Sequence, residues 1–151
     1  MQTVTLETEL EADAPAVWSA MLLPATFLHV CRGLFSMPAL ADRTAPMHQG
    51  DSGTGWLLAF HIIPAYRHTI EVVEVDHDDR TIRTREHGGV LRAWNHTLHV
   101  EPNDGAGSRY RDTIEIDAGH LTRMACIVAG GIFRYRQRRW RKFARTLPAG
   151  N

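Results

Sequence analysis

Three ionisable side chains fall on the apolar faces of three successive predicted strands. Alternation along each strand places Glu86, then His96, then Asp112 among residues such as Ile82 and Ile114 that belong in a core. Burial shifts the pKa of a carboxylate or an imidazole, and a group with a shifted pKa can act as a general acid or base. These three residues are therefore the candidate catalytic groups.

A carboxylate on an apolar face needs a partner, because an unpaired buried charge is costly. Arg136 and Arg139 are the natural partners, since the helical angle places both near the apolar side of the last predicted helix. We therefore expect Glu86 or Asp112 within salt-bridge distance of one of them. Two interpretations stay open: an ion-pair network that ties helix to sheet, or a polar cluster at the end of a cavity that orients a ligand or moves protons.

The last third of the chain predicts one long amphipathic helix over residues 121–147. Asp117 offers an N-cap, and Pro148 ends the helix. Gly130 and Gly131 lie at mid-helix, where each costs about 1 kcal/mol relative to alanine. We interpret the pair either as close packing or as room for a ligand. The stripe that we expect to face the core consists of Leu121, Ala125, Val128, Ile132, Tyr135, Phe143 and Leu147.

The rest of the chain predicts strands, with two short helices after the first strand. The first strand covers residues 3–12, Asp13 is an N-cap, and Pro24 opens the second helix. Residues 41–55 form the longest loop, and loops of this length are often lids or binding loops. Short connections between the later strands favour an antiparallel meander. Its strands are expected at residues 34–40 (an edge strand), 56–63, 67–76, 81–87, 91–101 and 108–116, with a turn at Pro64-Ala65.

Composition narrows the class of protein. The 151 residues are enough for one domain with a core, and 44% of them are apolar. No run reaches the roughly 18 apolar residues of a membrane span, and the N-terminal residues lack the basic and apolar regions of a signal peptide. Cys31 and Cys126 form no CxxC pair, which fits reduced thiols. We therefore expect a cytoplasmic protein without a membrane span.

The sequence carries no motif that indicates a cofactor or a nucleic acid. The histidines are scattered, and no zinc spacing, P-loop, GxGxxG or GxSxG motif occurs, so we expect no metal and no cofactor. Residues 118–151 contain basic but no acidic residues, whereas the net charge of the chain is zero, so the helix and the body attract each other. We expect no nucleic-acid partner. An interaction module that uses the basic helix remains an alternative, and the oligomeric state stays open.

The order of the elements resembles the START-like, or SRPBCC, superfamily, whose members include the birch-pollen-allergen class, lipid-transfer domains and aromatic polyketide cyclases. The local cues are EADAPAVWSAMLLPATF, TREHGGVLRAWNHTLHVEP, SRYRDTIEID and YRQRRWRKFARTL. The resemblance implies an α+β helix-grip fold in a single domain, residues 1–151. In that fold an antiparallel sheet of six to seven strands wraps around the C-terminal helix, with two short helices after the first strand. It also implies an apolar ligand cavity between sheet and helix.

From this resemblance we expect the protein to bind a small hydrophobic or aromatic molecule in that cavity. The alternative is a cyclase- or dehydratase-type enzyme in which Glu86 or His96 is the general acid or base. No catalytic residue is carried over from the superfamily, because the fold does not fix the chemistry. The residues that we expect to contact the ligand are Trp56, Phe60, Trp94, His96, Tyr110, Val128, Gly131, Ile132, Tyr135 and Arg139.

Overall fold

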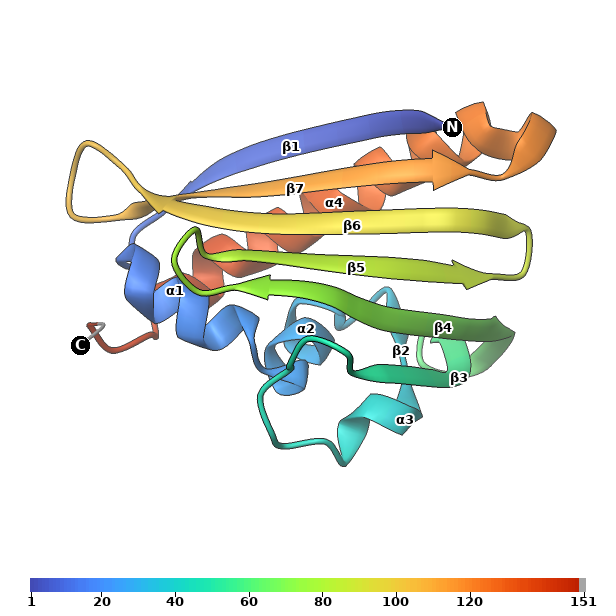
Figure 1. Ribbon diagram of the computed structural model, residues 1–151, viewed down its shortest axis with the longest axis horizontal. Helices are drawn as coiled ribbons and strands as arrows, with labels where there is room; N and C mark the ends of the chain where they lie inside the picture. The colour runs from blue at the N-terminus through green and yellow to red at the C-terminus, as the bar shows by residue number, and fades with distance from the viewer. Residues whose placement is uncertain (150–151) are drawn as a thin grey trace.

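A seven-stranded antiparallel sheet curls around a long C-terminal helix in the computed structural model, which describes residues 1–149 (Figure 1). The strands lie in the order β1-β7-β6-β5-β4-β3-β2, so the first strand lies beside the last. The strands are β1 (Gln2–Leu10), β2 (Phe35–Ser36), β3 (Ser52–Ala59), β4 (Ile63–Asp76), β5 (Thr81–Gly88), β6 (Leu91–Pro102) and β7 (Ser108–Asp117). The helices are α1 (Ala14–Met21), α2 (Pro24–Cys31), α3 (Pro38–Ala41) and α4 (Thr122–Ala144), with the 3-10 turn η1 (Gly119–Leu121) before α4. The predicted α+β helix-grip fold is thereby confirmed.

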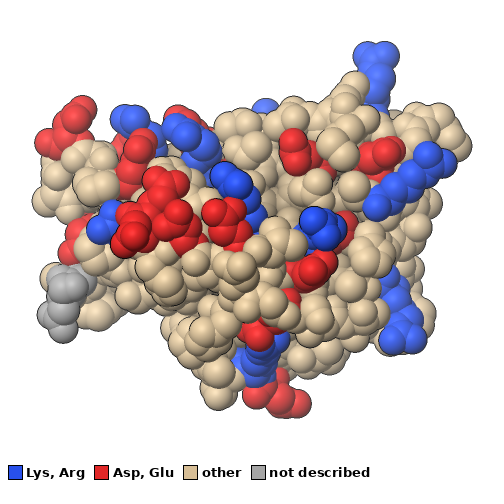
Figure 2. Space-filling model, in the orientation of Figure 1, with Lys and Arg blue, Asp and Glu red and all other residues tan. Residues whose placement is uncertain are grey.

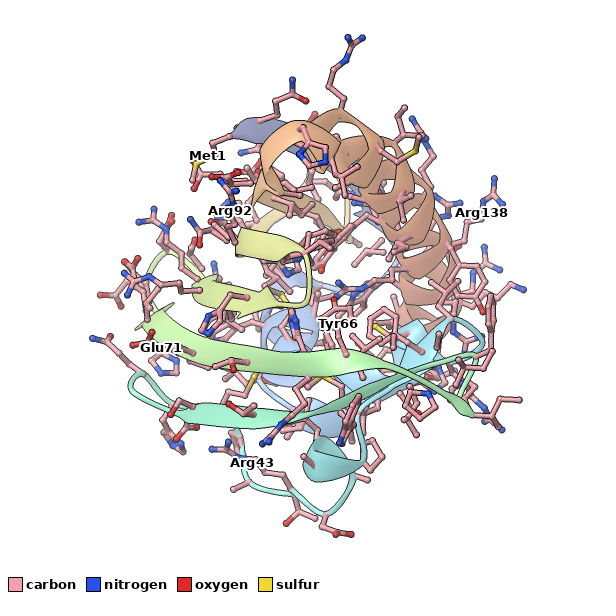
Figure 3. The ribbon with its side chains drawn as sticks, turned by 90° about the vertical axis from the view of Figure 1, so that its right-hand side faces the viewer. Met1, Arg43, Tyr66, Glu71, Arg92 and Arg138 are labelled. Carbon is pink, nitrogen blue, oxygen red and sulfur yellow. The ribbon has the colours of Figure 1, made fainter. Side chains whose placement is uncertain are left out.

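Helix α4 packs against β1 and β7, and α2 also contacts it. Two side chains of α4 hold it to β1: Gln137 donates from Nε2 to the Leu6 carbonyl oxygen at 3.0 Å, and Arg141 donates to Thr8 Oγ1 at 2.9 Å. Seen from the end of the molecule, side chains occupy the space between the sheet and α4, while Arg138 points away from both (Figure 3). The core therefore lies between one face of the sheet and one face of this helix.

The buried face of α4 differs from the predicted stripe. Leu121 is 42% exposed and Val128 is 53% exposed. The other members of the stripe (Ala125, Ile132, Tyr135, Phe143 and Leu147) are only half-buried. The predicted stripe was wrong because it contained apolar residues only, whereas the buried face also carries Arg136 and Gln137. Their burial rotates the inner face by about one residue. The buried side chains of the helix are Thr122, Ala129, Phe133, Arg136, Gln137, Trp140 and Ala144.

The opposite face of the sheet is polar. Figure 2 shows acidic and basic side chains interleaved over this side of the molecule. Several of them form ion pairs across neighbouring strands, and such exposed pairs each stabilise a fold by less than about 1 kcal/mol. Because these charged side chains occupy the outer face, only the opposite face of the sheet can pack against a core. The pairs are Glu7–Arg111, Glu9–Arg109, Glu71–Arg85 and Glu74–Arg83.

Three local predictions before the central strands need correction. The predicted turn at Pro64-Ala65 is wrong, because Pro64 lies in β4 opposite Leu58, and the chain turns at Phe60 and His61 instead. The expected edge strand over residues 34–40 shrinks to β2, since Pro38 opens α3. The expected loop over residues 41–55 ends early, because β3 already begins at Ser52.

Of the two predicted N-cap residues, Asp13 and Asp117, the first is confirmed and the second is wrong. Asp13 Oδ1 accepts a hydrogen bond from the Ala16 amide at 2.8 Å, which confirms the predicted N-cap of α1. Asp117 does not cap α4. Its side chain accepts from the Gly119 amide at 2.9 Å, and the turn η1 separates it from the helix, whose N-cap residue is Leu121.

Trp140 and Trp56 form a matched pair for testing this arrangement. Trp140 is 2% exposed between α4 and the sheet, whereas Trp56 is 51% exposed on β3. We predict that Trp140→Ala lowers the free energy of unfolding by about 3–5 kcal/mol, because it leaves a large void in the core. Trp56→Ala should lower it by less than about 1 kcal/mol. Urea unfolding followed by circular dichroism measures both, and equal losses would contradict the packing described here.

Candidate functional site

Glu86 is held by two neighbours on the inner face of the sheet. His68 Nε2, from β4, lies 2.8 Å from Glu86 Oε2, and Thr84 Oγ1 donates to Glu86 Oε1 at 2.5 Å. The β4–β5 pairing places Ile70 directly opposite Glu86, so His68 reaches the carboxylate diagonally. The other ring nitrogen of His68, Nδ1, is buried and has no hydrogen-bond partner among the described residues.

Asp112 is held by three neighbours from two strands and the helix. His96 Nε2 lies 2.8 Å from Asp112 Oδ1, and the hydroxyl of Tyr110 donates to the same oxygen at 2.9 Å. Gln137 of α4 donates to Asp112 Oδ2 at 3.0 Å. Asp112 has 0% exposure, and His96 has 4%. The predicted inward faces of β5, β6 and β7 are therefore right, since Glu86, His96 and Asp112 all point into the core.

Both carboxyl groups stay ionised despite burial. Burial alone raises the pKa of Glu86, but the hydrogen bond from His68 and the charge of His96 outweigh it and lower the pKa below the ordinary value. For Asp112, burial again raises the pKa. The hydrogen bond from His96 and the charges of His96 and Arg136 outweigh this effect, so the pKa of Asp112 lies below its ordinary value. Each carboxylate thus accepts hydrogen bonds from its neighbours, and each imidazole donates from Nε2.

The expected arginine partners of these carboxylates are wrong. Among the ion pairs of residues 1–149, Glu86 pairs with His68 and Asp112 with His96, and neither pairs with an arginine. Arg139 lies at the edge of α4 and donates to the His29 carbonyl oxygen at 2.9 Å. The physical reason is distance along the sheet: a histidine on the adjacent strand reaches a carboxylate directly, whereas α4 lies above the sheet and presents Gln137 to Asp112 instead.

Arg136 is buried in the middle of the interior. Its side chain is 3% exposed, and its guanidinium carbon lies 4.6 Å from the centre of the Phe133 ring and 5.4 Å from that of Phe27. These are cation–π distances. Its Nε atom has no hydrogen-bond partner in the described part of the chain.

A cavity of about 570 Å³ lies between α4, the inner face of the sheet and the segment after α2. Its walls are mostly apolar and aromatic, and Phe133 stacks beside Trp94 and against the edge of His96. The inner end is polar, with Glu86, His96 and Arg136. The lining side chains on its apolar walls include Phe27, Phe35, Leu57, Phe60, Tyr66, Leu91, Trp94, Leu121, Met124, Ala125, Val128, Ile132 and Phe133.

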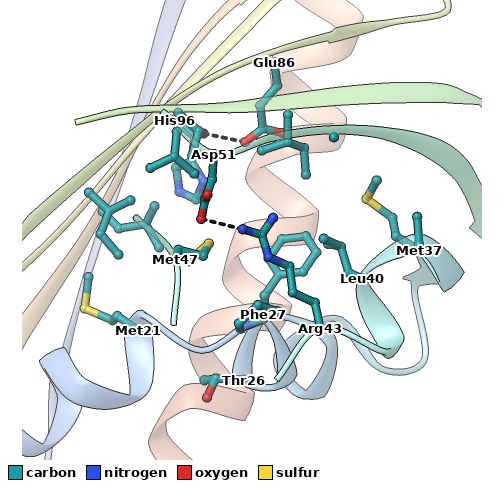
Figure 4. Close-up of a pocket in the computed structure, with 18 of the residues that line it drawn as sticks. Met21, Thr26, Phe27, Met37, Leu40, Arg43, Met47, Asp51, Glu86 and His96 are labelled. Atoms are coloured by element: carbon teal, nitrogen blue, oxygen red, sulfur yellow. Dashed lines mark hydrogen bonds and ion pairs between the residues drawn. The ribbon is translucent and has the colours of Figure 1, made fainter. Parts of the chain in front are cut away.

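A second cavity of about 200 Å³ lies on the other side of the polar end, under α1, α2, α3 and β3. Figure 4 shows its methionine-rich wall and the Arg43–Asp51 ion pair at its edge, with the nitrogen and oxygen atoms 2.5 Å apart. The two cavities share part of their lining, so one group of side chains faces both hollows. The shared residues are Phe27, Met37, Glu86, His96 and Arg136.

Half of the residues expected to contact a ligand lie in the wall of the larger cavity, and the rest lie elsewhere. Those in the wall are Phe60, Trp94, His96, Val128 and Ile132. Trp56 lines a shallow hollow on the outside of β3. Tyr110 is fully buried against Trp140, and the Tyr135 hydroxyl donates to the Arg32 carbonyl oxygen. Gly131 is exposed, and Arg139 lies at His29.

Sequence reasoning missed His68, Arg136 and the aromatic residues Phe27 and Tyr66 as parts of this site. His68 lies on β4, whose inward face was ambiguous because both faces carry apolar residues and a bulge falls between Val72 and Glu74. Arg136 was expected near the apolar side of the helix, as a partner for a carboxylate. It lies seven residues after Ala129, on the same side of the helix, and both residues are buried.

The described residues contain no group of three or more His, Cys, Asp or Glu side chains placed to hold a metal ion. The two cysteines are free, and burial raises the pKa of Cys31 to about 11, so this thiol stays protonated at neutral pH. No single helix in residues 1–149 is long and apolar enough to span a membrane. The polar end of the cavity presents the Glu86 carboxylate, the His68 and His96 imidazoles and the Arg136 guanidinium.

The fold, with its cavity between sheet and helix, is that of the START-like, or SRPBCC, superfamily. The chain belongs to the family described as domain of unknown function DUF8410, whose model matches residues 8–144. Comparison with curated proteins gives no sequence match.

Similar solved structures share the fold at low sequence identity. A protein from Arthrobacter aurescens superimposes with a TM-score of 0.73 at 12% identity, over 98% of this chain and 88% of that one. Norcoclaurine synthase from Thalictrum flavum, solved in complex with dopamine and hydroxybenzaldehyde, gives 0.62 at 14% identity, over 94% and 85%. The major latex-like protein of Panax ginseng gives 0.66 at 10% identity, over 95% and 97%. At these identities the likeness concerns the fold.

The buried Asp112 makes a prediction about pH. Its pKa is lowered in the folded state, so its contribution to stability is complete above the unfolded pKa of about 3.9 and is lost as the pH falls through the lower, folded value. Asp112→Asn should lower the free energy of unfolding at pH 7 by about 3 kcal/mol, because His96 loses its charged partner. The difference from the native protein should shrink below about pH 4.

Glu115→Gln is the matched control, since Glu115 lies on the same strand but on the exposed face. It should change stability by less than about 0.5 kcal/mol at either pH. Urea unfolding at pH 7 and at pH 3 measures both variants. A loss for Asp112→Asn that stays the same at both pH values would contradict the role assigned to this carboxylate.

The mid-helix glycines make a prediction about stability. A Cβ atom added at Gly131 would meet no heavy atom within 4 Å, and one at Gly130 would meet only Arg134 Nη1, at 3.5 Å. Replacing both with alanine should therefore raise the free energy of unfolding by up to about 2 kcal/mol through helix propensity. Thermal unfolding measures this. Neither glycine lines the larger cavity, so the double variant should bind apolar molecules as the native protein does.

Proposed function

We propose that the protein binds a small hydrophobic or aromatic molecule in the larger cavity. The observation that carries this proposal is a hollow of about 570 Å³ with mainly apolar walls inside a small protein. Protein interiors are normally packed to the density of organic crystals, so an open hollow of this size leaves apolar side chains without neighbours unless a molecule occupies it. Ligand cavities in proteins fall in the range of roughly 300–1,000 Å³ and have apolar walls with a few polar groups.

Exposed apolar side chains around the cavity give such a molecule a route of entry. They come from the β3–β4 turn, the β5–β6 turn, η1 and the first turns of α4. Large apolar side chains rarely gather on a surface without a function. The exposed fractions are 65% for Phe60, 65% for Val90, 42% for Leu121, 62% for Met124 and 53% for Val128.

The β3–β4 turn is held in place beside this rim. Phe60 and His61 adopt positive φ angles of 51° and 69°, which non-glycine residues rarely do. His61 Nε2 accepts a hydrogen bond from the Gly33 amide at 2.8 Å, and the Phe60 amide donates to the Leu34 carbonyl oxygen at 2.7 Å. These bonds offset the strain and fix Phe60 at the cavity wall, which supports a role for this turn in binding.

A filled-cavity variant tests the proposal. Ala125 lines the cavity from α4, so Ala125→Trp should occupy part of the space that a ligand needs. We predict that N-phenyl-1-naphthylamine, a neutral dye that fluoresces in apolar sites, binds the native protein and loses affinity by about tenfold or more in this variant, as expected for losing a buried apolar contact area. Arg123→Trp adds the same bulk at an exposed position of the same helix and should bind as the native protein does.

A cyclase- or dehydratase-type activity is the second candidate, favoured by the His96–Asp112 pair at the inner end of the cavity. An imidazole that donates from Nε2 to a carboxylate presents its other nitrogen as a base, as a catalytic histidine must. 2-Tetralone, an aromatic ketone with acidic C–H bonds, is a suitable probe. Deuterium uptake from D2O faster than in buffer, and lost in His96→Asn but not in His99→Asn, would support catalysis.

An interaction module built on the basic helix is the least supported candidate. Several arginines of this helix contact the protein's own body: Arg139 bonds the His29 carbonyl oxygen, Arg141 bonds Thr8, and Arg145 pairs with Glu11 at 2.9 Å. A helix face whose cations already have partners offers fewer of them to a nucleic acid or an acidic membrane.

A further inference from the structure

Arg136 is a buried cation that faces both cavities and donates no hydrogen bond to the residues that the structure describes. It is 3% exposed, lines the larger and the smaller hollow, and has an unpartnered Nε atom. Its guanidinium lies over the rings of Phe27 and Phe133. A guanidinium carries five N–H donors, and buried donors without acceptors are costly.

The charge of Arg136, in contrast to its donors, is already compensated. Burial opposes the charge, but the nearby Cys31, Asp112, Tyr110 and Glu86 groups, when ionised, outweigh it and raise the pKa of Arg136 above its ordinary value. At neutral pH the ionised groups among these four are Asp112 and Glu86, because the pKa values of Cys31 and Tyr110 are raised. Two ionised carboxylates therefore lie close enough to offset one guanidinium. Each of them already accepts hydrogen bonds from other residues. The site therefore lacks a hydrogen-bond acceptor for Arg136. A negatively charged ligand would be repelled by the two carboxylates, whereas a neutral acceptor would not.

We propose that Arg136 binds the carbonyl oxygen of an uncharged, largely aromatic ligand that lies in the larger cavity. The aromatic body would pack among Trp94, Phe133 and Val128, and its carbonyl group would point to the polar inner end. This inference rests on the proposed function and names the class of ligand: neutral aromatic ketones or quinones, rather than hydrocarbons or carboxylic acids. Arg136 is a binding residue in this proposal.

Three probes of similar size separate the possibilities: 2-ethylnaphthalene, 2-acetylnaphthalene and 2-naphthoate. Their affinities are measured by displacement of N-phenyl-1-naphthylamine from the native protein, from Arg136→Met and from Arg138→Met. Arg138 is the control because it lies on the same helix but is exposed (Figure 3). The ratio of acetyl to ethyl affinity should fall by about tenfold or more in Arg136→Met, as for a lost hydrogen bond to a charged donor. It should stay unchanged in Arg138→Met.

Each other outcome overturns a defined part of the argument. If none of the probes and not even the dye binds, the proposed function fails. If the probes bind but the ratio is the same in Arg136→Met, only the role of Arg136 fails. If 2-naphthoate binds the native protein most tightly, the ligand class is an anion and the neutral carbonyl is excluded.

A spectroscopic measurement covers the case in which Arg136→Met does not fold. The carbonyl stretch of 13C-labelled 2-acetylnaphthalene, bound to the native protein, should lie at lower frequency than in cyclohexane, because a charged donor weakens the C=O bond. A frequency equal to that in cyclohexane would show a carbonyl without a donor and would overturn the proposal without any variant.

Discussion

Two ionised carboxylates buried between a sheet and a helix constrain the rest of this structure. Glu86 and Asp112 need donors on every side, and they obtain them from neighbouring strands and from α4. Because side chains alternate along a strand, a slip of one residue in β5 or β7 would move these groups to the opposite face and separate them from His68 and His96. Gln137 extends the constraint to the helix, since its amide nitrogen bonds both Asp112 and the Leu6 carbonyl oxygen.

This network explains why the interior is divided. The carboxylates are paired within the sheet, so Arg136 is not required as their direct partner and its side chain stays between the two hollows with Glu86 and His96. Apolar side chains cannot close that space without covering charged and hydrogen-bonding groups, which is unfavourable. The result is a polar wall between an open apolar cavity of about 570 Å³ and a smaller one of about 200 Å³.

Strict alternation made the central strands predictable, and ambiguity elsewhere caused the errors. Glu86, His96 and Asp112 were placed on the inner face because β5, β6 and β7 alternate cleanly. β3 and β4 carry bulges that shift the alternation, so His68 was not predicted at the site and Trp56 was wrongly expected in the cavity wall. On α4, helical periodicity predicted the helix, but the stripe of apolar residues lies about one residue away from the buried face, which also carries Arg136 and Gln137. The pairing of charges depends on cross-strand register, which a sequence shows only after the strands are aligned.

The apolar side chains at the rim of the cavity link the stability of the fold to ligand binding. Phe60, Met124 and Val128 line the cavity and yet are more than half exposed, so each leaves apolar surface in contact with water. Burying that surface is worth about 25 cal/mol per Å², and an interior filled by these side chains would be the more stable protein. The turn at Phe60 and His61 prevents this filling and keeps Phe60 at the edge, since the Phe60 amide donates to the Leu34 carbonyl oxygen and the His61 ring accepts from the Gly33 amide. A bound apolar molecule would cover the same surface. The free energy of burying that surface would then contribute to binding, and the bound protein would be more stable than the empty one.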